Sequence, residues 1–372
     1  MSAGQHALEL TSVSDGVESE RSQQLLVLVA GAATTSRLSS VEQSPPSQPI
    51  TSLCSREPQA TCYSIHVVAS DLGRVTALSP MPDGRAMFIE DGRQVRVIAR
   101  GTLSPSAALA AEPGRRLTGL TTDSGFEESR LVFVAWTELA RGVPALNITR
   151  YREVENTLGE AAMISTALPA GPDLTTPLAV DNEDLVYVAV PADRSGSGQR
   201  FLGNAGAVMR FDRDGLVPRS NQYGSPIVAE GYGAPLALAI DRPQRTLWIA
   251  GRDRERLGAI ATLGLPTRRG SAWPSRPVAA AIQSAENEEI ESITIIGQRE
   301  TGDARRLVLA TGGRLLDIML TPQDAVRSVS DIPLGDGYSA HAVAADQDGS
   351  LYVGAQAPDG SGSVLILVRL TR

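Results

Sequence analysis

The chain has 372 residues, with 34 basic residues against 42 acidic ones, so its formal net charge is −8. Every basic residue is an arginine, because the sequence contains no lysine. A net acidic chain lacks the dense positive charge that sequence-independent nucleic-acid binding uses, and a chain without lysine has no side-chain amine to form a Schiff base. The composition therefore excludes these two classes, and we expect no nucleic-acid partner.

The first 63 residues are expected to form a tail that differs from the rest of the chain. They are rich in Ser, Gln, Thr and Pro, a composition that predicts disorder. The apolar run 25–33 has the length of a signal-peptide core, but four acidic residues precede it and only Arg21 opposes them. This run is too short to span a bilayer and no other segment is long enough, so we predict no transmembrane span. The compartment stays open, with an extracytoplasmic one, periplasmic or secreted, as the expectation.

The two cysteines, Cys54 and Cys62, lie close together in the tail. Two cysteines without histidines at finger spacing do not make a thiol metal site, so we expect no metal there. The pair predicts either a small disulfide loop, which would indicate an oxidising compartment, or two free thiols in a flexible segment.

One short phrase, a turn followed by alternating apolar residues, recurs along the remaining sequence. The centres of its six copies are 44 to 61 residues apart, and they are Phe88, Phe133, Tyr187, Trp248, Val308 and Tyr352. A turn and a strand at this period are typical of stacked blades in a β-propeller. We therefore predict an all-β fold, a six-bladed propeller over residues 64–372, which the tail precedes.

Each blade alone would leave an apolar face uncovered, so the ring must close on itself. The predicted clasp is the strand 65–70, which would complete the C-terminal blade as its missing strand. Residues 1–63 would then be dispensable for folding, whereas a deletion through residue 75 would not be tolerated.

Ligand sites in such rings lie at the mouth of the central channel, where the innermost strand of each blade begins. The positions just ahead of each phrase should therefore line that mouth. They are 75–76, 117–118, 175–176, 233–234, 291–292 and 340–341, and their side chains are mostly small, apolar or hydroxylic.

The stretches 77–98, 117–137, 149–172, 206–221 and 236–250, taken in order, resemble the soluble PQQ-dependent sugar dehydrogenases of the glucose/sorbosone dehydrogenase family. The likeness covers about residues 65–370. It implies a six-bladed propeller that oxidises aldoses by hydride transfer to the quinone, with PQQ and calcium as cofactors and a histidine as general base.

The family's functional residues are not matched in this sequence. The family places its base in a His-Asn-Gly-Gly stretch, where this chain has Asp-Leu-Thr-Thr-Pro at 173–177. An Arg-Asn pair that holds the cofactor is replaced by Gly233 and Ala234, and an acidic stretch is replaced by 252–258 (RDRERLG). The family's lysine contact to the quinone cannot exist here. The resemblance therefore implies a divergent member that lacks the catalytic His motif.

Only Glu291 and His341 at the expected mouth could titrate usefully, and they come from neighbouring blades. One interpretation makes them a catalytic base and its orienter. In the other, His341 bonds a backbone carbonyl and Glu291 belongs to the solvated acidic run 286–292. The remaining histidines, His6 and His66, lie in the tail and in the clasp.

The sequence thus favours a catalytically degenerate sugar-dehydrogenase-like propeller that acts as a binding or interaction module. Its partner would be a protein or carbohydrate ligand, and it would need no cofactor. The alternative is an active PQQ-dependent aldose or alcohol dehydrogenase with a rearranged site, in which His341 is the base. Whether the protein is an enzyme therefore stays open.

Overall fold

A computed structural model gives the structure of the chain, which divides into two compact units, Met1–Ser47 and Gln48–Arg372. The residues it describes are 4–8, 13–14, 17–18, 25–29, 51–54, 62–140, 143–169, 175–190, 206–221, 224–230, 234–243, 245–252, 259–265, 275–277, 288–296, 305–321 and 324–371.

The first unit holds two pairs of short antiparallel strands. Strand β1 (Gly4–Leu8) pairs with β4 (Leu25–Val29), and β2 (Val13–Ser14) pairs with β3 (Val17–Glu18). Strand β4 covers the beginning of the apolar run 25–33, and the rest of that run lies outside the described residues. Export of the chain stays a prediction.

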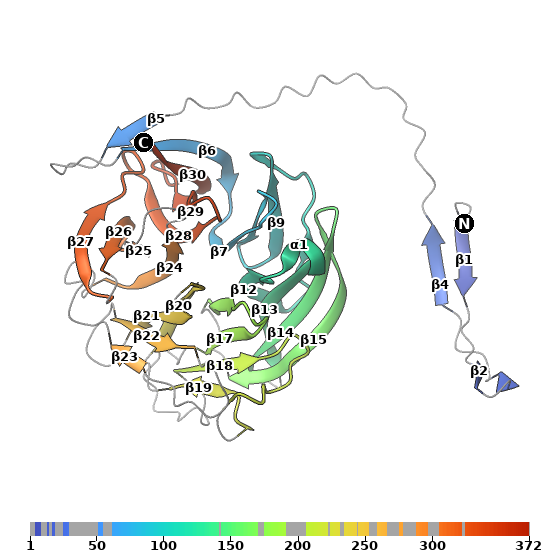
Figure 1. The fold of residues 1–372 in the computed structure, drawn as a ribbon. Coiled ribbons are helices and arrows are strands. Elements are labelled where there is room, and N and C mark those ends of the chain that lie inside the picture. The colour runs from blue at the N-terminus through green and yellow to red at the C-terminus, as the bar shows by residue number, and fades with distance from the viewer. Residues whose placement is uncertain are drawn as a thin grey trace, which may run out of the picture. The chain divides into compact units, whose positions relative to one another are not determined.

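The second unit is a six-bladed β-propeller, and Figure 1 shows its six sheets arranged in a ring. Blade 1 contains β7 (Val75–Pro80), β8 (Ala86–Glu90), β9 (Gln94–Ala99), β10 (Thr102–Leu103) and β11 (Leu109–Ala110). Blade 2 contains β12 (Arg115–Thr122), α1 (Phe126–Ser129), β13 (Leu131–Ala140), β14 (Val143–Val154) and β15 (Thr157–Pro169). Blade 3 contains β16 (Leu178–Val180), β17 (Val186–Val190), β18 (Ala207–Phe211) and β19 (Ile227–Ala229).

The other three blades have the same strand order. Blade 4 contains β20 (Ala234–Asp241), β21 (Thr246–Arg252), β22 (Ala259–Gly264) and β23 (Ser275–Pro277). Blade 5 contains β24 (Ile290–Ile296), β25 (Arg305–Thr311), β26 (Arg314–Leu320) and β27 (Val326–Asp331). Blade 6 contains β28 (Ser339–Ala345), β29 (Leu351–Gln356) and β30 (Ser363–Thr371), followed across the sheet by β6 (Cys62–Leu72) and β5 (Thr51–Cys54).

The six recurring phrases form the second strand of each blade, which confirms their prediction. Their central side chains are at most 7% exposed. An aspartate builds the turn that leads into the strand in several copies. Asp181 Oδ1 accepts hydrogen bonds from the backbone N–H groups two and four residues on, and Asp346 Oδ1 does the same. These side-chain bonds fix the tight turn, which explains why the phrase begins with a polar residue.

The apolar core lies between the blades. The buried apolar residues that the structure describes gather in six clusters, and one of them sits at each junction between neighbouring blades. Each sheet therefore has both faces covered only when the ring is closed. None of the helices in the described part of the chain is long and apolar enough to cross a membrane.

The ring closes through β6, as the clasp prediction requires, because β6 pairs antiparallel with the C-terminal strand β30. The sheet also extends beyond the predicted boundary at residue 64, since β5 adds a further strand on β6. Tyr63 is 2% exposed and its hydroxyl donates to Asp317 Oδ2 of blade 5 at 3.1 Å. Residues 51–54 and 62–63 therefore belong to the sheet of blade 6, and whether the protein folds without residues 1–63 stays a prediction. Because β5 has a largely polar sequence, it was predicted as part of the tail.

Cys54 and Cys62 are directly opposite each other in β5 and β6, and they form a disulfide in the structure. The bond links the outermost strand of blade 6 to the clasp strand.

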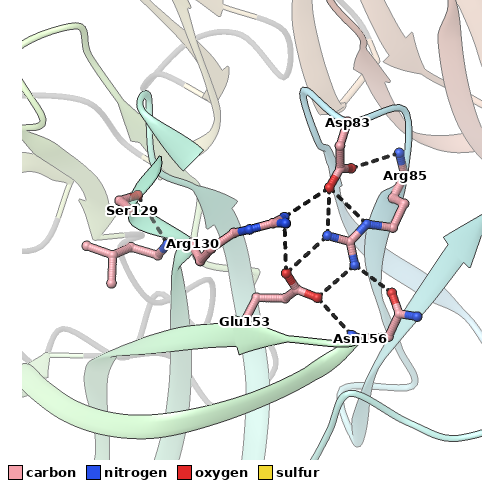
Figure 2. Close-up of polar contacts among 7 residues, drawn as sticks. Asp83, Arg85, Ser129, Arg130, Glu153 and Asn156 are labelled. Atoms are coloured by element: carbon pink, nitrogen blue, oxygen red, sulfur yellow. Dashed lines mark hydrogen bonds and ion pairs between the residues drawn. The ribbon is translucent and has the colours of Figure 1, made fainter. Parts of the chain in front are cut away.

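Arginines at the turns join the blades through ion pairs with carboxylates of the neighbouring blade. Arg85 of blade 1 contacts Glu153 of blade 2 at 2.7 Å, and Arg130 of blade 2 contacts Asp83 of blade 1 at 3.1 Å (Figure 2). Comparable pairs join the later blades, and they are Arg213–Asp123 at 2.8 Å, Arg245–Glu183 at 2.6 Å and Arg305–Asp241 at 2.7 Å. The arginine that stands between the turn and the strand in several of the recurring phrases thus joins neighbouring blades.

Candidate functional site

A central channel of about 660 Å³ runs between the innermost strands of all six blades. We call the end where these strands begin the near mouth, which includes Thr76, Thr118, Thr176 and Glu291. The end where the strands finish is the far mouth, which includes Asp123, Arg242 and Asp346. The sequence placed its candidate site at the near mouth.

The near mouth is built by a β-bulge that recurs in the innermost strand of five blades. The register of each strand skips one residue against its neighbour, and the skipped residues are Thr76, Thr118, Leu236, Glu291 and His341. A bulge leaves one residue unpaired and re-aims its side chain. The repeated bulge therefore sets one side chain per blade at the same level of the ring.

Blades 2 and 3 meet at the near mouth through two threonines. The Thr118 hydroxyl donates to Thr176 Oγ1 at 3.0 Å, and the Thr176 backbone N–H donates to the Thr118 carbonyl at 2.8 Å. This approach requires a glycine, because a Cβ at Gly119 would lie 2.0 Å from the Thr176 carbonyl oxygen. The local sequence Thr-Gly therefore fixes a hydroxylic section of the channel wall.

Glu291 projects from β24 and makes an ion pair with Arg74, which immediately precedes β7. The distance is 2.8 Å, and the side chains are 34% and 62% exposed. The pair joins blade 5 to blade 1 across the start of blade 6. The carboxylate is therefore held by a cation at the near mouth.

His341 does not line the channel. Its imidazole hydrogen-bonds backbone groups of Ser339 and Val75, and its Nε2 is buried without a hydrogen-bond partner. Burial disfavours the charged ring and the nearby Arg74 charge adds to this, so the pKa of His341 falls to about 4. The imidazole is thus neutral at physiological pH.

Six of the twelve mouth positions expected from the sequence line the channel. They are Thr76, Thr118, Thr175, Thr176, Glu291 and Ser292. In blade 4 the skipped residue is Leu236, just beyond the predicted position, while Gly233 and residues 173–174 lie outside the described residues. Glu291 and His341 are brought to the same mouth, but the partner that the structure gives Glu291 is Arg74.

Sequence reasoning missed Arg74 as a site residue. Arg74 directly precedes the first innermost strand and follows Gly73. This position is the one sequence feature that could have indicated a role at the mouth. Arg242 at the far mouth was not predicted either. It follows the end of β20, whereas the sequence prediction concerned only the beginnings of the innermost strands.

A sequence profile of the glucose/sorbosone dehydrogenase family matches residues 72–252, which hold the first three blades and the beginning of the fourth. This segment, just under half of the chain, is therefore similar to the glucose/sorbosone dehydrogenase family. A search of curated protein sequences found no relative of the chain.

Solved structures of sugar dehydrogenases share the fold. The soluble aldose sugar dehydrogenase of Escherichia coli, in its apo form, is 16% identical with a TM-score of 0.64 over 83% of this chain and 100% of its own. The PQQ-bound aldose sugar dehydrogenase of Streptomyces coelicolor is 18% identical with a TM-score of 0.60 over 82% and 98%. The holo PQQ domain of pyranose dehydrogenase from Coprinopsis cinerea is 12% identical with a TM-score of 0.57 over 87% and 98%. At these identities the likeness shows the fold alone.

Proposed function

We propose that this protein is a divergent member of the glucose/sorbosone dehydrogenase family, a binding module that has lost quinone-dependent catalysis, and that its near mouth holds a neutral carbohydrate. The observation that carries the proposal is the position of His341. A general base must come within hydrogen-bond reach of the proton that it removes. His341 is not among the residues that line the channel, its imidazole bonds backbone groups, and its low pKa makes it a weak base, so we assign it to packing rather than proton abstraction.

The residues described at the near mouth do not fit PQQ. The carboxylates of the quinone need cationic partners. Arg74, the described cation that contacts Glu291, is engaged by that carboxylate at 2.8 Å. Calcium takes six to eight oxygen ligands, and the described residues contain no group of three His, Cys, Asp or Glu side chains that could hold a metal ion. The described residues of the near mouth therefore do not suit either PQQ or calcium.

The wall of the near mouth suits a ligand rich in hydroxyl groups. Thr76, Thr118 and Thr176 line it, and Thr76 Oγ1 is buried without a hydrogen-bond partner. A hydroxyl both donates and accepts hydrogen bonds, so a sugar can satisfy such positions without bringing a charge into the channel. Among the described residues that line the near mouth, Glu291 carries the one carboxylate, and it is paired with Arg74.

The alternative function is an active PQQ-dependent dehydrogenase whose site is completed by other residues. The PQQ-bound relatives in the family's fold favour it. For this chain it would require cations other than Arg74 and a base other than His341.

We further propose an extracytoplasmic location. The Cys54–Cys62 disulfide supports it, because disulfides persist in oxidising compartments and are rare in the cytosol.

The carbohydrate proposal predicts that aldoses bind the purified protein and that Thr76→Val weakens this binding. Valine has the shape of threonine but lacks the hydroxyl, so the loss of one hydrogen bond should raise Kd by about 2- to 10-fold. Calorimetric titration with a panel of neutral sugars measures this. Thr102→Val, on the outer strand β10, is the matched control and should bind as the parent does. A panel in which no sugar binds, or a Thr76→Val variant with parental affinity, would contradict the proposal.

A further inference from the structure

The far mouth of the channel contains a charged group that the proposed carbohydrate site does not use. Arg242 lies in the turn that follows β20, and its side chain lines the channel. Within the described part of the chain its guanidinium has no ion-pair or hydrogen-bond partner. Desolvation lowers the pKa of Arg242, while the charges of Asp123 and Asp181 oppose this. Arg242 is exposed, so its guanidinium is accessible to a ligand that enters this mouth.

Asp123 provides a second, independent observation at the same mouth. It lines the channel from the end of blade 2 and is 1% exposed. Its Oδ2 accepts hydrogen bonds from the Ser129 hydroxyl at 2.6 Å and from Arg213 Nη2 at 2.8 Å. Its Oδ1 is buried and has no hydrogen-bond partner. Buried polar atoms almost always have a hydrogen-bond partner, so we expect a donor from outside the chain to bind this oxygen.

The guanidinium of Arg242 and the carboxylate of Asp123 come from different blades. Asp123 is close enough to Arg242 to influence its pKa, yet the two residues form no ion pair. Ser124 also borders a neighbouring recess of about 610 Å³, which Glu128, Asn182 and Asp184 line. The far mouth therefore borders a second hollow, with Ser124 between them.

We propose that the far mouth binds a small zwitterion of the α-amino acid class. Its carboxylate would accept hydrogen bonds from Arg242, and its ammonium would donate to Asp123 Oδ1. Both protein groups are formally charged, and charge-assisted hydrogen bonds compensate the desolvation of such groups better than neutral hydroxyls do. Asp123 and Asp346 line this mouth and the charge of Asp181 also acts on Arg242, so a simple anion would be repelled, whereas a zwitterion adds no net charge.

The test uses the full chain, with glycine as the smallest probe that carries both groups. Acetate and methylammonium supply each half separately, and glucose supplies neutral hydroxyls. In calorimetric titrations we expect glycine to bind at least about tenfold more tightly than acetate or methylammonium. Arg242→Gln and Asp123→Asn should each weaken glycine binding by about tenfold or more. Thermal melts of both variants check that the fold is intact.

Two controls separate this site from the near mouth and from nonspecific charge effects. Arg245→Gln removes a neighbouring arginine that pairs with Glu183 and does not line the channel, and it should bind glycine as the parent does. Thr76→Val should do so as well, so the two proposals can fail separately. The zwitterion proposal is overturned if glycine gives no binding heat, if acetate binds as tightly as glycine, if glucose displaces glycine, or if a folded Arg242→Gln variant keeps the parental affinity.

Discussion

A chain that begins at Gly73 is expected not to fold, whereas a chain that begins at Gln48 should be as stable as the full protein. The longer deletion removes β5 and β6, and it exposes β30 as an unpaired edge. It also removes Tyr63, Ile65 and Leu72, which are at most 6% exposed. A buried side chain of this size contributes about 1.5–3 kcal/mol, so together these three approach the about 5–15 kcal/mol of a typical domain. Circular dichroism and urea melts of the two truncations measure the difference.

A chain that begins at Ser64 makes the experiment quantitative. It keeps most of the clasp but loses β5, the disulfide and Tyr63, whose hydroxyl bonds Asp317 and accepts from Arg306 Nη2 at 3.1 Å. We expect a folded protein whose free energy of unfolding is lower by about 2–4 kcal/mol. Equal urea midpoints for the chains that begin at Gln48 and Gly73 would show that β6 does not close the ring.

Glu153→Gln is expected to lower the free energy of unfolding by about 2–4 kcal/mol. The Glu153 side chain is 2% exposed, and it accepts hydrogen bonds from Arg85 and from the Asn156 backbone N–H (Figure 2). Removing the negative charge leaves Arg85 and Arg130 with only Asp83 between blades 1 and 2. Urea melts at neutral pH give the change. Glu112→Gln is the matched control, because Glu112 is 68% exposed in its pair with Arg115 and should cost less than about 1 kcal/mol.

The stability difference between the parent and Glu153→Gln should depend on pH. Burial raises the pKa of Glu153. The hydrogen bonds from Arg85 and Asn156 lower the pKa by more than burial raises it, so the net pKa lies below its usual range. The stability that the ionised carboxylate contributes is therefore present above the ordinary glutamate pKa of about 4.3 and is lost as the pH falls through the lower folded-state value. The difference between parent and Glu153→Gln should shrink in acid. A difference that stays constant with pH, or no difference at neutral pH, would argue against the ion pair as the source of stability.

The fold could be predicted because its signal is local and repeated. The apolar alternation around Phe88 or Trp248 and the turn residues ahead of it specify a strand and its entrance without knowledge of the partner strands. The clasp followed from the need to close the ring. Strand β5 could not be predicted, because its stability depends on a disulfide and on β6 rather than on its own polar sequence.

The candidate site was predictable only as a set of positions. The beginnings of the innermost strands led to Thr76, Thr118 and Glu291, but the bulge that aims these residues depends on pairing with the second strand. The Arg74–Glu291 pair joins residues 217 positions apart, and the Arg85–Glu153 pair joins residues 68 apart. Contacts at such separations have no local sequence pattern. The unpartnered atoms of Arg242 and Asp123 likewise become visible only when all neighbours are placed.

We propose that the propeller has kept the family fold without quinone catalysis at its near mouth. The most direct measurement incubates the purified full chain with PQQ and calcium ions and follows dye reduction with a panel of aldoses, alongside PQQ-dependent thermal melts. We expect no turnover above the protein-free control and no rise in melting temperature with PQQ. Turnover with any aldose, above all turnover that His341→Ala abolishes, would contradict the claim and establish the active dehydrogenase instead.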